Sequence, residues 1–388
     1  MRAICNVCCH HCSLEEGRTG ACGARTNKGG QITASNYGRL TALALDPIEK
    51  KPLARFMPGS RILSVGSYGC SLRCPFCQNY EIASARPACM DNACGESAGR
   101  NTDRTAGPAV TSSGPGRESG ATAITSSDPG RESGSSITSS GPGQESGATA
   151  ITSSDPGQES GASITSSGPG RESGNNKIIT YKDPGPLIGK NSGGREHRLE
   201  IAEYTPQELC SLALDLRVRG NIGIAFTYNE PLVGWEFVRD TARLFHENGM
   251  KTVLVTNGMA SQEILQELLP CIDAMNIDLK GFTEDFYREF VGGDLNMVKD
   301  FISAAAEGCH VEITKLIIPG KNDSESEMRR MAAWIASLRG GTGKDIPLHV
   351  SRYFPRYKWT APATSVKTVY RLAETAREKL DYVYTGNC

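Results

Sequence analysis

The sequence is poor in aromatic residues and has no long hydrophobic run. Aromatic residues make up 6% of the 388 residues and hydrophobic residues 38%, so part of the length does not build a hydrophobic core. No apolar stretch approaches the roughly 20 residues needed to cross a bilayer. The opening Met1-Arg2-Ala3-Ile4-Cys5 also lacks the hydrophobic core of a signal peptide. These absences predict a cytoplasmic protein without a membrane span.

An excess of charge of either sign is missing as well. The chain has 42 basic and 43 acidic side chains, for a formal net charge of −1. Such a protein has no overall field that would attract polyanions, and we therefore expect no nucleic-acid partner. Cysteine, in contrast, is abundant, with 14 residues. Where thiols are kept reduced, clustered cysteines more often hold metal than pair as disulfides.

The shortage of aromatic residues is concentrated in residues 87–197, where Tyr181 stands alone. Five copies of a Thr-Ser-Ser-Gly/Asp-Pro-Gly-Arg/Gln-Glu-Ser-Gly unit begin at Thr111, Thr125, Thr138, Thr152 and Thr165. Each unit offers at most one isoleucine, which is too little apolar surface to offset the entropy of ordering the chain. We expect a disordered, low-complexity Ser/Gly/Pro insertion. It is either a repeat expansion in a tolerant loop or a flexible tether.

The rest of the chain alternates short apolar runs with amphipathic stretches. Strands are expected at 62–65, 222–226, 252–255, 275–279, 311–318 and 348–351. Helices are expected at 205–218, 231–248, 262–269, 283–290, 296–307, 325–338 and 366–379. About six strand-plus-helix units predict an α/β fold, a partial (βα)6 TIM-like barrel whose chemistry lies at the carboxyl ends of its strands. The expected domains are an N-terminal Cys-rich module (1–55), the barrel (56–86 and 198–388) and the insertion (87–197).

Three cysteines, Cys70, Cys74 and Cys77, directly follow the first predicted strand. A zinc ribbon would need a second C-x2-C knuckle, and a thioredoxin-like pair needs only two cysteines. An iron–sulfur cube ordinarily takes four protein thiolates, so three from one loop would leave one iron open to another ligand. The alternative is a closed cluster with a remote fourth ligand such as Cys89 or Cys94.

The triplet, with Phe76 before its last cysteine, resembles the C-x3-C-x2-C motif of the radical S-adenosylmethionine (SAM) superfamily. The resemblance implies a [4Fe–4S] cluster on the three cysteines, chelated by the amino and carboxylate groups of SAM. It also implies a low-potential electron donor such as flavodoxin or ferredoxin. One electron would cleave SAM to a 5′-deoxyadenosyl radical, which abstracts hydrogen from a substrate, while the protein binds and orients the reactants.

Polar residues at the end of the second strand continue the resemblance. Glu230, with Tyr228 and Asn229 beside it, occupies the place of the superfamily's Gly-Gly-Glu segment, which receives the SAM ammonium. A carboxylate suits an ammonium held in a dry cleft. The alternative is that Glu230 is only the first-turn acid of the helix that begins at Pro231.

The next two strands also end in polar residues. Thr256, Asn257 and Gly258 can hydrogen-bond a ribose or a carboxylate, although each could equally cap a loop. Asp278 and Lys280 stand two residues apart and therefore on one strand face. If that face points inward, both reach the site.

A second cysteine group lies at the amino terminus. Cys5, Cys8, Cys12 and Cys22 can close a tetrahedral shell, as a structural zinc or a fully ligated auxiliary cluster requires. Cys9, His10 and His11 are competing donors, and the spacing leaves the metal undecided. A metal would stabilise a module that has little core of its own.

This N-terminal pattern, together with Tyr37-Gly-Arg, the run from Asp46 to Leu53 and Cys77-Gln-Asn, narrows the resemblance. The chain resembles the radical SAM member of the AmmeMemoRadiSam system, which is similar to pyruvate formate-lyase-activating enzymes. The activating branch implies a place near the SAM ribose or adenine for His349, although a solitary histidine is usually structural.

Three functions remain open at this point. The first is an oxidoreductase- or lyase-type radical SAM enzyme acting on an unidentified substrate. The second is an activase that abstracts hydrogen from a glycine of a partner protein. The third is a non-enzymatic scaffold in which the cysteine triplet holds a structural metal.

Overall fold

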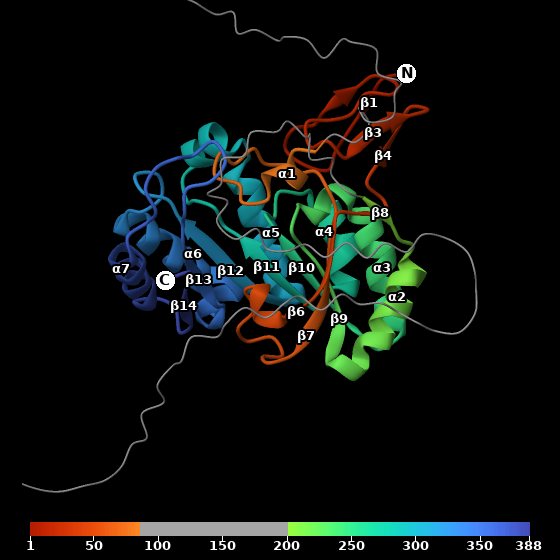
Figure 1. The fold of residues 1–388 in the computed structure, drawn as a ribbon. Coiled ribbons are helices and arrows are strands. Elements are labelled where there is room, and N and C mark those ends of the chain that lie inside the picture. The colour runs from red at the N-terminus through yellow and green to blue at the C-terminus, as the bar shows by residue number, and fades with distance from the viewer. Residues whose placement is uncertain (86–200) are drawn as a thin grey trace, which may run out of the picture. The chain divides into compact units, whose positions relative to one another are not determined.

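The computed structural model describes residues 1–85 and 201–388. In these ranges an eight-stranded sheet of order β14-β13-β12-β11-β10-β9-β7-β6 carries the fold (Figure 1). Its strands are β6 (Ala42–Pro47), β7 (Arg61–Gly66), β9 (Asn221–Phe226), β10 (Lys251–Thr256), β11 (Ala274–Asp278), β12 (His310–Ile317), β13 (Leu348–Arg352) and β14 (Val383–Gly386). Neighbouring strands are parallel except β6, which is antiparallel to β7. The predicted insertion at 87–197 lies outside the described residues.

All six predicted strands are present and parallel, which confirms the α/β partial-barrel prediction. Two further strands, β6 and β14, extend the sheet at its two edges and were not predicted. Each pairs on one side only. The four residues Val-Tyr-Thr-Gly of β14 are of mixed polarity, and the Ala-Leu-Ala-Leu run of β6 does not alternate apolar with polar residues, so neither shows a strand period.

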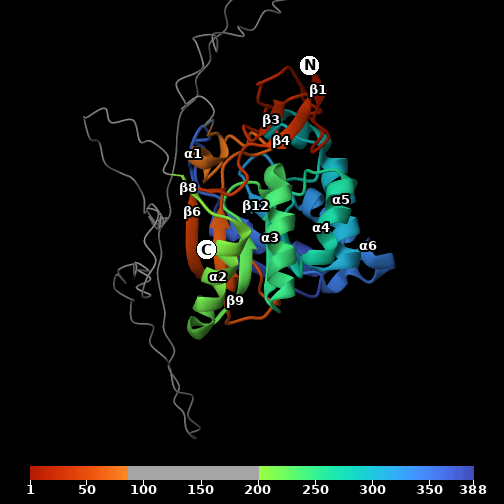
Figure 2. The same cartoon turned by 90° about the vertical axis from the view of Figure 1, so that its right-hand side faces the viewer.

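Helices follow the parallel strands and pack neighbour to neighbour on the outside of the sheet (Figure 2). They are α2 (Pro206–Asp215), α3 (Trp235–Glu247), α4 (Gln262–Leu268), α5 (Leu295–Gly308), α6 (Glu325–Gly341) and α7 (Val366–Arg377), with the short α1 (Tyr80–Ala83) after the cysteine triplet. Short 3-10 turns are η1 (Ile48–Lys50), η3 (Leu216–Arg219), η4 (Pro231–Gly234), η5 (Leu269–Cys271) and η7 (Gly343–Asp345). The helix predicted from 231 therefore opens with η4, and the one predicted at 283–290 is largely a π-helix, η6 (Phe286–Val291).

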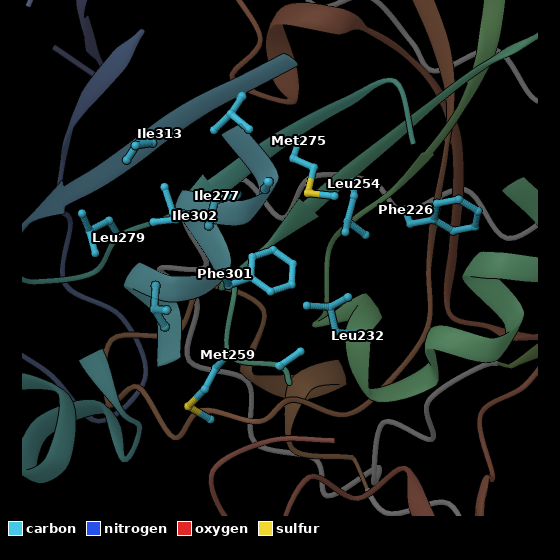
Figure 3. Packing of buried hydrophobic residues seen from close by; sticks show 14 of the residues in the cluster. Phe226, Leu232, Leu254, Met259, Met275, Ile277, Leu279, Phe301, Ile302 and Ile313 are labelled. Atoms are coloured by element: carbon cyan, nitrogen blue, oxygen red, sulfur yellow. The ribbon is translucent and has the colours of Figure 1, made fainter. Parts of the chain in front are cut away.

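The main core lies between the sheet and the helices (Figure 3). Phe226, Leu254 and Met275 from three adjacent strands belong to the same buried cluster as Phe301 and Ile302 of α5. Side chains alternate across a strand, so the residues next to these point to the inner face of the sheet. Full burial of each large apolar side chain contributes about 1.5–3 kcal/mol.

The inner face of the sheet is filled by the segment that follows β6. Ile48 and Leu53 are fully buried in a second cluster with Ala225 and Val253, the strand neighbours of Phe226 and Leu254. This segment therefore occupies part of the barrel interior.

The amino-terminal module consists of two hairpins. They pair β1 (Ala3–Ile4) with β2 (Ser13–Leu14) and β3 (Arg25–Lys28) with β4 (Gln31–Ala34), while β5 (Arg39–Leu40) pairs with β8 (Ala202–Glu203). The guanidinium of Arg25 is 2.6 Å from the carboxylate of Glu236 in α3, which ties the module to the barrel. Within residues 1–85 and 201–388, no helix combines the length and apolar character that a membrane span requires.

Candidate active site

A cavity of about 360 Å³ at the carboxyl ends of the parallel strands brings most of the predicted site residues together. From the sequence-based set, its lining includes Cys70, Cys74, Phe76, Cys77, Tyr228, Asn229, Glu230, Thr256, Asn257, Asp278 and Lys280. Gly258 and His349 do not line it. Residues that are far apart in sequence therefore converge on the loop that carries the cysteine triplet.

This loop, Gly69–Cys77, is called the cluster loop here. Gly69 has a φ of +92°, and a Cβ there would lie 2.8 Å from the carbonyl oxygen of Cys22, so only glycine fits. The amide of Leu72 donates to the sulfur of Cys70 at 3.4 Å, and that of Arg73 donates to the carbonyl of Val291 at 2.8 Å. Amide hydrogen bonds thus hold the part of the loop that follows the first cysteine.

Burial raises the pKa of all three thiols, that of Cys74 to about 12. They are therefore protonated at neutral pH until a metal displaces the protons. Asn257 Nδ2 lies 3.7 Å from the sulfur of Cys70 and can stabilise the thiolate. No group of three or more His, Cys, Asp or Glu side chains in residues 1–85 and 201–388 surrounds a single-ion position. Three thiols around one cavity instead fit a cluster, which holds its ligands farther apart than one ion does.

Glu230 lies at the centre of the site and is 2% exposed. Its carboxylate accepts hydrogen bonds from Thr256 Oγ1 at 2.7 Å and from the Asn257 amide at 2.8 Å. It also accepts from the amide of Leu232 at 3.0 Å, so Glu230 is the N-cap of η4 and not an acid of its first turn. Burial nevertheless raises the pKa of Glu230 to about 7. The carboxylate is both a cap and the acid of the cavity.

Asn229 joins the loops around the cavity. Its Oδ1 accepts from the amide of Ser67 at 2.9 Å, and its Nδ2 lies 3.2 Å from the carbonyls of Tyr68 and Gly69. Every polar atom of this side chain thus contacts backbone. Asn229 therefore positions the start of the cluster loop.

Tyr228 adopts a φ of +69°, and its hydroxyl donates to Asp46 at 2.6 Å. Lys51 lies 4.7 Å from the centre of the Tyr228 ring, and its ammonium is 2.7 Å from the same Asp46 carboxylate. Burial lowers the pKa of Lys51. Asp46 and Lys51 were not predicted as site residues. The sequence drew attention to the Asp46–Leu53 run only through its resemblance to a family.

Asp278 and Lys280 both face the cavity and form an ion pair of 2.7 Å. Burial alone would lower the pKa of Lys280, but Asp278 and the thiol of Cys74 raise it. The lysine is therefore a permanent cation beside the cysteine sulfurs. Such a cation stabilises anionic ligands in a site with little water.

The two remaining predicted residues lie elsewhere. Gly258 has a φ of +69°, and a Cβ there would lie 3.0 Å from Ile277, so this glycine serves a tight turn over the core. His349 Nε2 is 2.6 Å from Glu312, and its ring stacks on Tyr384. It lines a neighbouring cavity instead of the one with the triplet.

This neighbouring cavity has a volume of about 830 Å³. Its walls include Ala44 and Asp46 of the edge strand β6 and residues 384–386 of the opposite edge strand β14. Lys50, Lys51 and Tyr228 line both cavities, so the two are adjacent. The unclosed side of the sheet therefore offers room for a second molecule next to the triplet site.

Comparisons with known proteins agree with this geometry. Residues 193–335 match the model of the Radical SAM superfamily. The chain is 29% identical over 387 residues to the uncharacterized protein MJ0808 of Methanocaldococcus jannaschii, covering 99% of this chain and 80% of that protein. It is 26% identical over 148 residues to pyruvate formate-lyase 1-activating enzyme of Escherichia coli K12, covering 37% of this chain and 59% of the enzyme.

The chain is also similar to one further activating enzyme and to one solved domain. Pyruvate formate-lyase-activating enzyme of Clostridium pasteurianum is 29% identical over 141 residues, which are 35% of this chain and 59% of that enzyme. The chain thus spans 59% of the length of these activating enzymes. A solved domain of pyruvate-formate lyase-activating enzyme from Bacteroides vulgatus overlays with a TM-score of 0.37 at 20% identity, covering 42% of this chain and 98% of that domain.

The superfamily implies a [4Fe–4S] cluster and SAM, for which the cluster loop and its cavity supply three thiols and a polar wall. Residues 193–335 therefore match the Radical SAM superfamily, and part of the chain is similar in sequence to pyruvate formate-lyase-activating enzymes.

Proposed function

We propose that this protein is a radical SAM enzyme that cleaves SAM reductively and acts on a substrate held beside the cluster loop. The observation that carries the proposal is the convergence of Cys70, Cys74 and Cys77 with Glu230 on one cavity. When bound, the cluster and SAM supply an electron and a 5′-deoxyadenosyl radical. We also propose that the protein is the radical SAM member of the AmmeMemoRadiSam system.

Five residues of the cavity have a task in holding the cofactors in this proposal. Cys70, Cys74 and Cys77 hold the cluster by three corners. Glu230 receives the SAM ammonium, because a buried carboxylate gains most from a cation that shares its low-dielectric surroundings. Lys280 lies beside the thiols and offsets the negative charge of a thiolate-ligated cluster.

Two residues orient these groups without holding the cofactors themselves. Asn257 donates to Glu230 through its backbone and points its side-chain amide at Cys70. It therefore fixes the acid and the first cluster ligand relative to each other. Thr256 holds the other carboxylate oxygen of Glu230 at 2.7 Å.

The larger cavity is the proposed substrate chamber. It shares Lys50, Lys51 and Tyr228 with the triplet site, so a molecule bound there lies next to the SAM site. Closeness of the reacting groups is the main requirement of a hydrogen abstraction that must outrun reaction with solvent. The radical would thus meet its substrate in the adjoining cavity.

Anaerobic reconstitution tests this function. With iron, sulfide, a strong reductant and SAM, the protein should form 5′-deoxyadenosine, and Cys74→Ala should form none. Cys309→Ser is the matched control, because Cys309 is a half-buried thiol outside both cysteine groups. Absence of 5′-deoxyadenosine from a fully reconstituted wild-type chain would favour the scaffold interpretation.

The second candidate is an activase for a partner protein. The names of the Escherichia coli and Clostridium pasteurianum relatives favour it. The 830 Å³ chamber between two sheet edges could receive an extended peptide. Incubation with a candidate partner should then produce a glycyl-radical signal in electron paramagnetic resonance, and a small-molecule enzyme should not.

A further inference from the structure

The amino-terminal module contains four cysteines that the proposed function does not use. In the first hairpin the amide of Cys5 donates to the carbonyl of Cys12 at 2.9 Å, so these two residues face each other beyond β1 and β2. Cys8 lies in the connecting turn, where its carbonyl accepts from the amide of His11 at 3.3 Å. Cys5 and Cys8 are 5% and 7% exposed. The hairpin thus gathers three thiols at one end.

The fourth thiol comes from the next turn. Cys22 is 6% exposed and lies in a turn that the amide of Gly23 closes on the carbonyl of Gly20 at 3.0 Å. A Cβ on Gly20 would lie 3.4 Å from the sulfur of Cys12, so this turn packs against the hairpin thiols. Cys22 is also electrostatically coupled to Cys5 and Cys12, and Cys8 to Cys5 and Cys22. The four thiols therefore form one group.

Backbone amides act on two of these sulfurs. Cys8 has a backbone hydrogen bond with His10, and Cys22 has one with Ala24, in each case two residues further along the chain. The cluster loop shows the same spacing, where the amide of Leu72 donates to Cys70. An amide donor favours the thiolate over the thiol, and the thiolate is the form that ligates metal. The N-terminal group thus repeats a local arrangement of the triplet.

The module also contacts the cluster loop directly. The amide of Cys70 donates to the carbonyl of Cys22 at 3.1 Å. This hydrogen bond directly joins a candidate ligand of the triplet to a candidate ligand of the N-terminal group. His10 Nε2 lies 2.8 Å from the carbonyl oxygen of Ser71. On the other side, the carbonyl of Val7 accepts from the amide of Ser261, which follows the Asn257 loop. The four-thiol group is therefore hydrogen-bonded to the cluster loop and to the segment that follows Asn257.

We propose that a metal centre, either zinc or an iron–sulfur cluster, is bound by Cys5, Cys8, Cys12 and Cys22 and fixes the position of the cluster loop. Cys5 and Cys12 face each other at one end of the first hairpin, and the turn that carries Cys22 packs against Cys12, so one centre can join both turns. The carbonyl of Cys22 then holds the amide of Cys70 in place. The metal site can be tested without SAM cleavage, whereas the coupling rests on the proposed cluster at Cys70, Cys74 and Cys77.

Metal content per chain tests the site itself. The full-length protein is reconstituted anaerobically with iron and sulfide, with and without zinc, and bound iron, sulfide and zinc are measured. Cys74→Ala should keep one metal centre, Cys8→Ser should lose that centre, and Cys309→Ser should match the wild type. A Cys74→Ala protein that binds neither iron nor zinc would overturn the site. Because this variant lacks the triplet, the result is independent of the proposed radical chemistry.

The coupling is tested through the barrel cluster. Cys8→Ser removes the proposed metal, and His10→Ala removes the contact with Ser71 while leaving all four thiols in place. Both should change the electron paramagnetic resonance spectrum of the reduced cluster. His10→Ala should also weaken SAM binding about fivefold, the factor associated with one hydrogen bond. Spectra and SAM affinity in both variants that equal those of Cys309→Ser would overturn the coupling.

Discussion

Replacement of Glu230 by glutamine tests the polar half of the candidate site most sharply. Burial raises the pKa of this carboxyl from 4.5 to about 7. A shift of that size corresponds to about 3 kcal/mol against the charged form in the folded protein. A SAM ammonium beside the carboxylate would offset this cost. As the pH is raised towards 7, the SAM affinity of the reconstituted wild type should therefore increase by up to tenfold per pH unit. Above pH 7 it should level off.

The glutamine variant should bind SAM about thirtyfold more weakly at pH 8, because a charge-assisted hydrogen bond is worth about 2 kcal/mol. Its affinity should follow only the titration of SAM itself, which the wild type shares and which can be subtracted. Glu263→Gln, in the first turn of α4, is the control and should keep the wild-type profile. Anaerobic calorimetry between pH 6 and 8.5 measures all three. Equal profiles for Glu230→Gln and the wild type would refute the assignment.

The pH dependence of the stability of the SAM-free protein is a second test of the raised pKa of Glu230. A carboxyl with a raised folded-state pKa stabilises the protein fully below its unfolded pKa, and this contribution is lost as the pH rises. Unfolding free energy should therefore fall between about pH 4.5 and 7 by up to about 3 kcal/mol from this group alone. The glutamine variant should lack that part of the slope.

Three further predictions concern stability and are measured by urea unfolding. Burial raises the pKa of Glu312, but hydrogen bonds from His310 and His349 outweigh burial and lower this pKa to about 2. Its contribution of about 3 kcal/mol is present above pH 4.5 and lost as the pH falls through 2, so Glu312→Gln should cost about that much at pH 7, and a cost below 1 kcal/mol would contradict this. Lys315 and Glu327 form a buried ion pair with an N–O distance of 2.7 Å. Lys315→Ala should lower the unfolding free energy by about 3–5 kcal/mol because it leaves the Glu327 charge uncompensated, whereas a Lys315→Met, Glu327→Leu double variant should be near neutral. Equal losses in the two variants would contradict this reason. Phe301→Ala should lower the unfolding free energy by about 3–5 kcal/mol. A smaller loss would mean that α5 moves to fill the space left by the removed ring.

The fold was predictable from sequence where the physical signal is local and strong. The strand at 222–226 is a continuous apolar run, and Thr205 with Glu208 forms the capping box that begins α2. The edge strand β14 was missed because four residues of mixed polarity carry no period, and only pairing with β13 defines them. The pairing with β13, which is a tertiary contact, therefore defines a strand that the local sequence pattern does not predict.

The site shows the same division. The cysteine triplet was predictable because ligand spacing is a property of one short loop. The joint role of Asp46, Lys51 and Tyr228 was not, since the hydroxyl of Tyr228 reaches the local Asp46–Lys51 ion pair from a segment 182 residues away. For His349 the resemblance implied a place near the SAM ribose or adenine, and the structure adds a contact with Glu312 of the neighbouring strand that the sequence did not show. Residue type and spacing thus indicated candidate site residues, whereas the contacts of these residues depend on how the elements pack.

The account depends on an open corner of the cube held by Cys70, Cys74 and Cys77. Electron–nuclear double resonance on the reduced protein, with SAM labelled at its amino nitrogen and carboxylate oxygens, probes that corner directly. Coupling of both labels to the cluster, absent from Cys74→Ala, is the predicted result. A loop occupied by zinc, or a cube saturated by four protein sulfurs with no coupling to labelled SAM, would contradict the proposed function.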